Sequence, residues 1–353
     1  MAQITLYAQA NGNWDTANNW NTVAGGGGTA YTNPQNGANT FICDLNSKAI
    51  TFNVSTITVD KIIASDNVSY LNNASGSKIL NAIIEYSGNM TTTGFIRNSG
   101  TLTINGKVLS TGGTGYTVGT SSSTEIIINA GSDGIAVEST STTTNRTVYI
   151  SAGSITINGN VAKSGSGSGF AVYSTRPFTF NGNVIVTGGA YAVYQRTSAM
   201  TWTPNLNETY QINVTAGSYP LMLAGGSLTL NGYVNCRPTH ASSSQKFYIS
   251  SSSCPFIWLD TLVVPENVTM MLMTAGPLVF ADATKALNIQ NYGKIWIWKS
   301  GTQAETVTAA GGTAQIRNMS KYAQVCLMNM QNKATEDIVT RHTMTRFLGV
   351  RKV

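Results

Sequence analysis

The sequence predicts an all-β protein of the parallel β-helix type, a solenoid with about 21–29 residues in each coil. One observation is an eight-residue phrase that recurs along the chain. A second is that apolar and polar residues alternate within this phrase, as in a strand with one buried face. A third is that no repeating unit has a convincing helical pattern. The four copies are TLTINGKV (101–108), SITINGNV (154–161), PFTFNGNV (177–184) and SLTLNGYV (227–234).

The spacing of the phrases indicates the size of one coil. Ile104 and Ile128, and likewise Ile157 and Phe180, are separated by about 23–24 residues, a period typical of solenoids. Three short strands and three turns fill such a length, so we expect these four residues to stack in the core, about 4.8 Å apart. Asn-Gly ends each strand because both residues tolerate positive φ, and ladders of asparagine can satisfy one another at the turns. A β-sandwich pair or a propeller with blades of about 40–50 residues is the alternative.

The pattern divides the chain into four segments. Residues 1–45 are an expected N-terminal cap that precedes the first regular strands, and residues 46–235 are the β-helix. Residues 236–300 are a less regular terminal β region, and residues 301–353 are a C-terminal docking or oligomerisation segment.

Two tryptophans, Trp14 and Trp20, stand among turn residues of the N-terminal segment. A solenoid must cover its terminal coil to prevent edge-to-edge stacking with another chain, and two large rings would do this. The alternative is that the exposed ring faces contact a sugar. Both interpretations remain open at the level of sequence.

Two sets of residues near the C-terminus are candidate contacts. In KIWIW the rings of Trp296 and Trp298 share one face, which indicates either a subunit contact or a local core. The stretch from Gln331 to Val353 is mildly basic, and it either covers the last coil or docks on an acidic surface such as a capsid. The candidate docking residues are Arg341, Arg346, Arg351 and Lys352.

Composition argues against several classes of partner and site. The net charge is +6, with no run of Lys and Arg typical of a nucleic-acid arm. The start of the chain lacks the apolar run of a signal peptide, and no stretch approaches the length of a membrane span. The cysteines form no CxxC pair, so we expect neither a metal nor another cofactor. Cys236 and Cys254 either pair between neighbouring coils or remain buried thiols.

The scarcity of acidic residues argues against catalysis. Glycoside hydrolysis requires two carboxylates about 5–10 Å apart. The chain has only 15 Asp and Glu, and a single one, Glu208, lies between Glu138 and Asp260. Asp133 and Glu138 are close in sequence, but we interpret each as a turn or surface residue. We therefore expect a protein that is not an enzyme.

The stretch GNWDTANNWNT, followed by NTFICDLNSKAITFNVSTITVDKI, resembles the opening of β-helical surface proteins such as autotransporter passengers and phage β-helix proteins. The resemblance covers residues 1–65, and the repeat style extends it to residue 234. Because we expect no signal peptide, the resemblance favours a phage virion protein that is made in the host cytoplasm. It implies a homotrimer on the virion surface that decorates or cements the capsid, or forms a head spike, with the major capsid protein as partner. A tail spike that binds or cleaves host polysaccharide and a bacterial adhesin are the alternatives.

Overall fold

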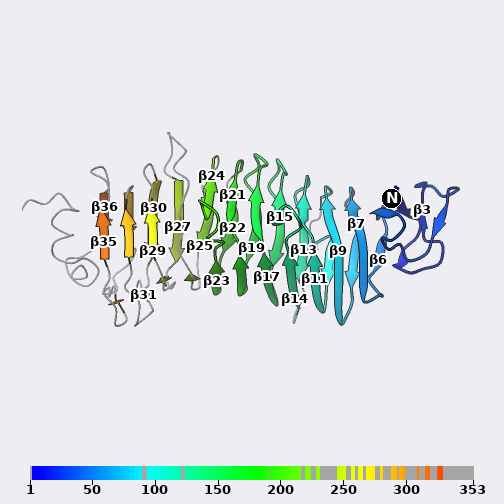
Figure 1. Ribbon diagram of the computed structural model, residues 1–353, viewed down its shortest axis with the longest axis horizontal. Helices are drawn as coiled ribbons and strands as arrows, with labels where there is room; N and C mark the ends of the chain where they lie inside the picture. The colour runs from blue at the N-terminus through cyan, green and yellow to red at the C-terminus, as the bar shows by residue number, and fades with distance from the viewer. Residues whose placement is uncertain are drawn as a thin grey trace, which may run out of the picture. The chain divides into compact units, whose positions relative to one another are not determined.

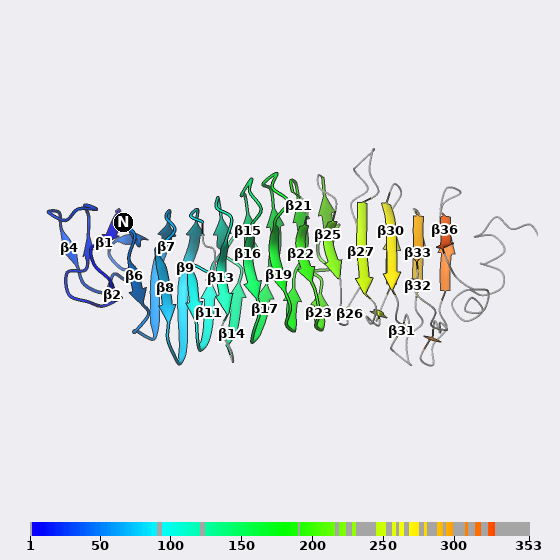
Figure 2. The same cartoon turned by 180° about the vertical axis from the view of Figure 1, so that it is seen from behind.

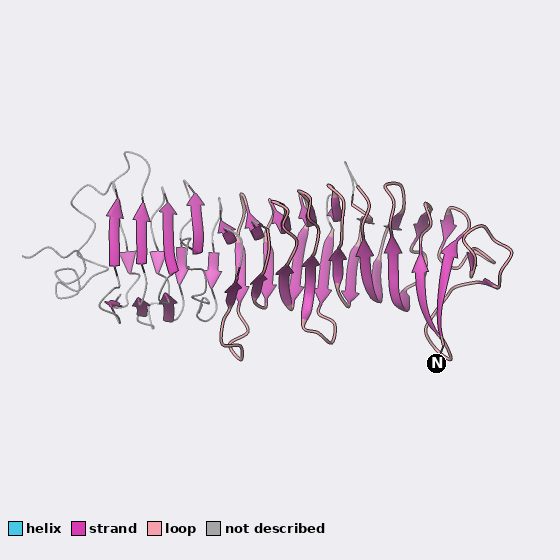
Figure 3. Cartoon of the chain, turned by 90° about the horizontal axis from the view of Figure 1, so that it is seen from above, coloured by secondary structure: helices cyan, strands magenta, loops and turns pink. Residues whose placement is uncertain are grey.

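A computed structural model describes residues 2–89, 94–120, 124–189, 191–215 and 219–223, together with the backbone of strands between residues 228 and 328. The described residues form strands and turns and no helix (Figure 3). Within these residues, therefore, no helix could cross a membrane. The chain divides into two compact units, Met1–Pro177 and Phe178–Val353.

The first unit is a parallel β-solenoid, which confirms the predicted fold class and rules out the sandwich and the propeller (Figure 1). Its successive coils are joined by parallel pairs of strands. The strands are β1 (Gln3–Ala8), β2 (Gly12–Asn13), β3 (Trp20–Asn21), β4 (Ala30–Tyr31), β5 (Thr40–Asp44), β6 (Ala49–Thr51), β7 (Thr56–Ala64), β8 (Tyr70–Asn73), β9 (Ser77–Tyr86), β10 (Ile96–Asn98), β11 (Thr101–Asn105), β12 (Val108–Ser110), β13 (Tyr116–Thr120), β14 (Glu125–Asn129), β15 (Ile135–Ser139), β16 (Arg146–Ile150), β17 (Ser154–Asn158), β18 (Asn160–Lys163) and β19 (Phe170–Ser174).

One coil consists of three strands, for example β11, β12 and β13. The first two belong to one sheet that bends at a corner, and the third belongs to a second sheet. The Asn-Gly of the repeated phrase forms the corner, but only the glycine takes a positive φ, with 155° at Gly106 and 140° at Gly159. The expectation for asparagine was wrong at these two corners. A side chain at Gly106 would collide with the Ala82 carbonyl of the previous coil, so glycine is required there.

Aligned aliphatic residues fill the core of the first unit. Ile104 pairs in register with Ile128, and Ile128 with Ile157; all three are fully buried, as the sequence predicted. The second sheet contributes its own column, in which Val118, Val148 and Val172 are in register. The two columns of aliphatic side chains, one from each sheet, remove apolar surface from water in every coil. Each coil is buried by its neighbours, so the solenoid is stabilised cooperatively.

An asparagine ladder runs along the corner of the first unit. The Nδ2 atom of each asparagine donates to the Oδ1 atom of the one before it, at 2.8 Å from Asn105 to Asn81 and at 2.7 Å from Asn129 to Asn105 and from Asn158 to Asn129. Asn81 ends the ladder by donating to Thr58 Oγ1 at 3.0 Å. The predicted asparagine ladder is therefore present.

Replacing Asn129 by alanine should lower the free energy of unfolding by about 1–2 kcal/mol, because this side chain makes two bonds of the ladder. Urea unfolding followed by circular dichroism measures the change. Asn39→Ala is the matched control, since none of the described hydrogen bonds involves its side chain. Equal effects of the two substitutions would contradict a stabilising ladder.

The N-terminal segment contains a strand that the sequence did not reveal. Strand β1 pairs in parallel with β5, which follows the whole Trp-containing stretch, and antiparallel with β3. The expectation that regular strands begin only after the Trp-containing turns was therefore wrong. The partner of β1 lies far away in sequence, so local periodicity alone gave no sign of the pairing.

The second unit repeats the parallel architecture. Phe180 is in register with Trp202, their fully buried rings stack at 5.9 Å, and Trp202 Nε1 donates to Gly182 O at 2.9 Å. The strands are β20 (Phe178–Asn181), β21 (Val184–Val186), β22 (Tyr191–Gln195), β23 (Met200–Thr203), β24 (Ile212–Val214), β25 (Tyr219–Leu223), β26 (Leu228–Leu230), β27 (Gln245–Ser251), β28 (Phe256–Trp258), β29 (Thr261–Val264), β30 (Val268–Thr274), β31 (Val279–Phe280), β32 (Asn288–Asn291), β33 (Lys294–Trp298), β34 (Thr308–Ala309), β35 (Gln315–Asn318) and β36 (Gln324–Met328).

Candidate functional site

The two N-terminal tryptophans form a buried pair. Trp14 and Trp20 are fully buried, and their ring centroids lie 4.6 Å apart. Trp20 Nε1 donates to the Trp14 carbonyl at 2.9 Å, and Trp14 Nε1 donates to the Pro34 carbonyl at 3.3 Å. Neither ring face is available to a sugar in this structure, and both rings serve as the core of the N-terminal segment.

The C-terminal candidates lie largely outside the described residues. The backbone of Trp296 and Trp298 belongs to β33, which pairs in parallel with β30 and β36. The proposed capsid-docking residues Arg341, Arg346, Arg351 and Lys352 lie outside the described residues, as do Cys236 and Cys254. These assignments stay predictions.

The acidic pair considered from sequence is held by a lysine that the sequence did not single out. Lys107 Nζ lies 2.8 Å from an Asp133 carboxylate oxygen and 2.7 Å from a Glu138 carboxylate oxygen. Burial alone would raise the pKa of Asp133, but hydrogen bonds from Lys107 and from the Ile135 amide outweigh it and lower the pKa. Asp133 is thus held ionised and is poorly suited to act as a general acid.

The first unit carries a different candidate site on the outer face of its second sheet. Aromatic rings and arginines project there from the neighbouring strands β8, β10, β13, β16 and β19. Figure 2 shows the backbones of β13, β16 and β19 side by side. We call this surface the Tyr–Arg face. It consists of the partly exposed Tyr70, Arg97, Tyr116, Arg146, Tyr149 and Phe170, together with the buried Tyr173 that packs against them.

The parallel register creates the Tyr–Arg face. One row runs through Tyr116, Arg146 and Phe170, and a second row runs through Arg97, Gly119, Tyr149 and Tyr173. Two buried residues separate the rows on β13, β16 and β19. Residues far apart in sequence therefore meet as neighbours, about 4.8 Å from strand to strand.

Each arginine of the face packs against aromatic rings. The guanidinium carbon of Arg97 lies 3.5 Å from the ring centroid of Tyr70. That of Arg146 lies 4.9 Å from Tyr149 and 4.2 Å from Tyr173. The rings also contact one another, at 5.0 Å between Tyr116 and Tyr149. Cation–π contacts of this kind are worth about 0.5–1 kcal/mol each when exposed, so together they favour this arrangement of the side chains.

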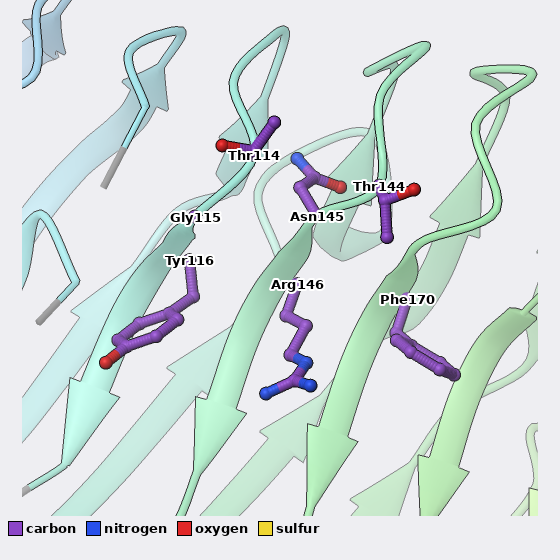
Figure 4. Close-up of a pocket in the computed structure, with 7 residues that line it drawn as sticks. All are labelled: Thr114, Gly115, Tyr116, Thr144, Asn145, Arg146 and Phe170. Carbon is purple, nitrogen blue, oxygen red and sulfur yellow. The ribbon is translucent and has the colours of Figure 1, made fainter. Parts of the chain in front are cut away.

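Two hollows open on the Tyr–Arg face. The first, of about 300 Å³, lies between Tyr116, Arg146 and Phe170, and Figure 4 shows these side chains on three neighbouring strands, with Arg146 in the middle. The second, of about 320 Å³, includes Arg97, Gly119 and Tyr149 in its lining. The described lining residues of both hollows include no Asp, Glu or His.

The tyrosine between the two hollows is held neutral. Burial raises the pKa of Tyr116, the neighbouring Tyr149 raises it further, and Arg146 opposes the shift. A neutral phenol both donates and accepts a hydrogen bond, which suits a ligand rich in hydroxyl groups. The described part of the chain contains no cluster of three or more His, Cys, Asp or Glu that could hold a metal ion.

Comparisons with known proteins give no family assignment. No protein-family model, curated protein or solved structure matches the chain. Function is therefore inferred from the residues of the Tyr–Arg face and from the fold.

Sequence reasoning missed the Tyr–Arg face, although its signal is present in the chain. The segments YTVG (116–119), RTVY (146–149), FAVY (170–173) and YAVY (191–194) share a buried pair between two flanking positions that lie on the sheet's outer face. Sequence reasoning followed the Asn-Gly phrase and did not interpret the residues that flank these buried pairs as a surface. In the second unit the fourth segment places Tyr191 and Tyr194 with ring centroids 6.4 Å apart.

Proposed function

We propose that this chain is a non-enzymatic β-solenoid that binds a saccharide along its Tyr–Arg face. The observation that carries the proposal is a group of partly exposed aromatic rings with arginines packed beside them; the rings are those of Tyr70, Tyr116, Tyr149 and Phe170. The face of an aromatic ring is electron-rich, and the C–H bonds on a sugar ring can pack against it. Sites for small ligands combine aromatic side chains with a few polar groups. The two hollows, of about 300 and 320 Å³, are large enough to hold a sugar ring.

The proposal favours binding over turnover for a chemical reason. Saccharide cleavage by acid–base chemistry needs a suitably placed pair of carboxylates. The described residues lining the hollows supply none, and the described acids Asp133 and Glu138 are engaged with Lys107. The lack of such a pair argues for binding over cleavage, and the rings and arginines of the Tyr–Arg face support a receptor-binding role ahead of capsid decoration.

A virion surface is the proposed setting, and a homotrimer is the proposed assembly; both rest on the resemblance described for the N-terminal segment. Analytical ultracentrifugation of the purified chain should give three times the mass of 37.4 kDa. A monomer would contradict the trimer but would leave saccharide binding untouched.

Replacing Tyr149 by leucine should weaken saccharide binding at least about tenfold, as expected for a central aromatic contact. Leucine keeps apolar packing beside Tyr116 and Tyr173 but removes the aromatic face. An array of bacterial surface polysaccharides, probed with fluorescently labelled protein, measures the effect. Tyr7→Leu is the control, because Tyr7 lies on β1, away from the Tyr–Arg face.

The proposal fails if the wild-type chain binds no polysaccharide on the array. It also fails if Tyr149→Leu and Tyr7→Leu bind as the wild type does. An unfolding curve for each variant separates lost binding from lost folding.

A further inference from the structure

We propose that the ligand of the Tyr–Arg face is an anionic polysaccharide that carries uronic acid carboxylates, and that Arg97 binds one of these carboxylates in the second hollow. This inference rests on the proposed saccharide-binding function and names its ligand class. It is carried by four observations on the described residues, which concern ion pairing, shape, spacing and charge.

Neither Arg97 nor Arg146 has a carboxylate partner among the described residues. The described ion pairs of the chain involve lysines, Glu85 with Lys61 at 2.7 Å and the Asp133–Glu138 pair with Lys107, and all three of these acids belong to or flank strands of the other sheet. Arg97 makes no described hydrogen bond, and its buried Nε atom lacks any partner there. Buried donors are almost always satisfied in folded proteins. The Arg97 guanidinium also lines the second hollow, so its donors can meet an acceptor that enters there. A carboxylate matches the fork of a guanidinium with two parallel hydrogen bonds.

The shape of the second hollow places a sugar ring next to that guanidinium. Gly119 occupies the register position between Arg97 and Tyr149, and all three residues line this hollow. A Cβ atom on Gly119 would lie 2.9 Å from Gly94 N and 3.0 Å from Tyr116 Cε2, so the Tyr116 ring packs over this glycine and borders the same hollow as Arg97 and Tyr149. A pyranose can thus pack against Tyr149 while its carboxylate reaches Arg97.

The spacing of the face suits a polymer rather than a single sugar. Arg97, Gly119, Tyr149 and Tyr173 follow one another on adjacent strands, about 4.8 Å apart. An extended polysaccharide repeats over a similar length per sugar. The polymer would lie across the strands, with one sugar opposite each strand.

The charge of the face favours an anion. The described residues that line the hollows contribute Arg97 and Arg146 and no acidic side chain. A concave surface with charges of one sign attracts ligands of the opposite sign, and this attraction weakens with added salt. A neutral saccharide would leave both guanidinium groups without an anionic acceptor.

The test compares each polymer with its own neutral form. Polygalacturonate, alginate and hyaluronate are immobilised intact, and also after chemical reduction of their carboxylates to hydroxymethyl groups. Binding of the full chain to each surface is followed by biolayer interferometry. We expect at least one intact polymer to bind, its reduced form to bind about 10- to 100-fold more weakly, and Arg97→Gln to lose a similar factor only on the intact form.

Lys78→Gln is the matched control, because it removes one positive charge that also lies over a ring, that of Phe52 at 5.9 Å, but lines neither hollow. Arg146→Gln provides a second variant if Arg97→Gln is poorly folded. Arg97→Lys should restore part of the binding, since it keeps the charge but loses the planar fork.

Each outcome decides between distinct possibilities. Equal binding of intact and reduced polymers, with loss in Tyr149→Leu, overturns the acidic ligand but leaves saccharide binding standing. No binding of either form, together with a blank polysaccharide array, overturns both proposals. Binding of polyglutamate as tightly as the uronates, with no effect of Tyr149→Leu, would indicate an acidic protein partner and overturn the inference.

Discussion

Replacing Trp20 by alanine should lower the free energy of unfolding of the first unit by about 3–5 kcal/mol, the usual cost of removing a buried large aromatic side chain. The ring is fully buried, packs on Trp14 at 4.6 Å and donates a hydrogen bond to the Trp14 carbonyl. Its loss leaves a cavity and an unpaired carbonyl, so the transfer, cavity and hydrogen-bond effects all act in the same direction.

Urea unfolding followed by far-ultraviolet circular dichroism measures this loss without relying on tryptophan fluorescence. Trp20→Phe should cost less, about 1–3 kcal/mol, because it keeps a ring but removes the indole N–H. A cost below about 1 kcal/mol for the alanine variant would contradict a structural role. Unchanged binding to polysaccharide by Trp20→Phe is expected, because the ring is enclosed in the N-terminal segment.

Replacing Lys163 by methionine should raise the free energy of unfolding at pH 7 by about 2–3 kcal/mol. Lys163 ends strand β18, is 1% exposed and has no hydrogen-bond partner for its Nζ atom among the described residues. A buried ammonium group without a partner loses its hydration and gains no hydrogen bond or ion pair that would offset this cost. Methionine has a similar length and fills the same space without a charged group.

The pH dependence of this effect has a defined sign. Burial lowers the pKa of Lys163 below its ordinary value of 10.5 in the folded chain. Between the lowered pKa and 10.5, the unfolded chain binds more protons than the folded one, so this group makes stability rise with pH. The advantage of Lys163→Met should therefore shrink as pH approaches that value.

Stability curves of the wild type and Lys163→Met, measured from pH 7 to pH 10, check this sign. The comparison is made as a difference, because burial also raises the pKa of Tyr86, which makes stability fall above the ordinary pKa of tyrosine. Lys48→Met, at a half-buried position that follows a turn, is the control. A destabilised Lys163→Met would show that the ammonium has a stabilising partner.

The proposed saccharide-binding surface depends on residues that are separated along the chain. Tyr116, Arg146 and Phe170 belong to three successive coils, and no local motif joins them. They become neighbours because parallel strands stack in register. Local pattern reveals that each position faces outward, but the combination of rings and cations is a property of the stacked coils.

The orientation of the N-terminal tryptophans was also not predictable from local sequence. Their positions among turn residues were compatible with a cap and with a sugar contact, because sequence does not define which way a ring in a turn points. Packing decides the question: the two rings bury each other, and strand β1 joins them to the solenoid through its pairs with β3 and β5.

The sequence by itself determined the class of fold, the coil length and the core column of Ile104, Ile128 and Ile157, because strand periodicity and a repeated Asn-Gly corner are local properties that recur with the coil. Only the tertiary structure decided that Lys107 holds Asp133 and Glu138, and that Arg97 stands unpaired beside Gly119 among the described residues. The physical reason is that ion pairs and hollows depend on distances between side chains on different coils, which are fixed by register and packing.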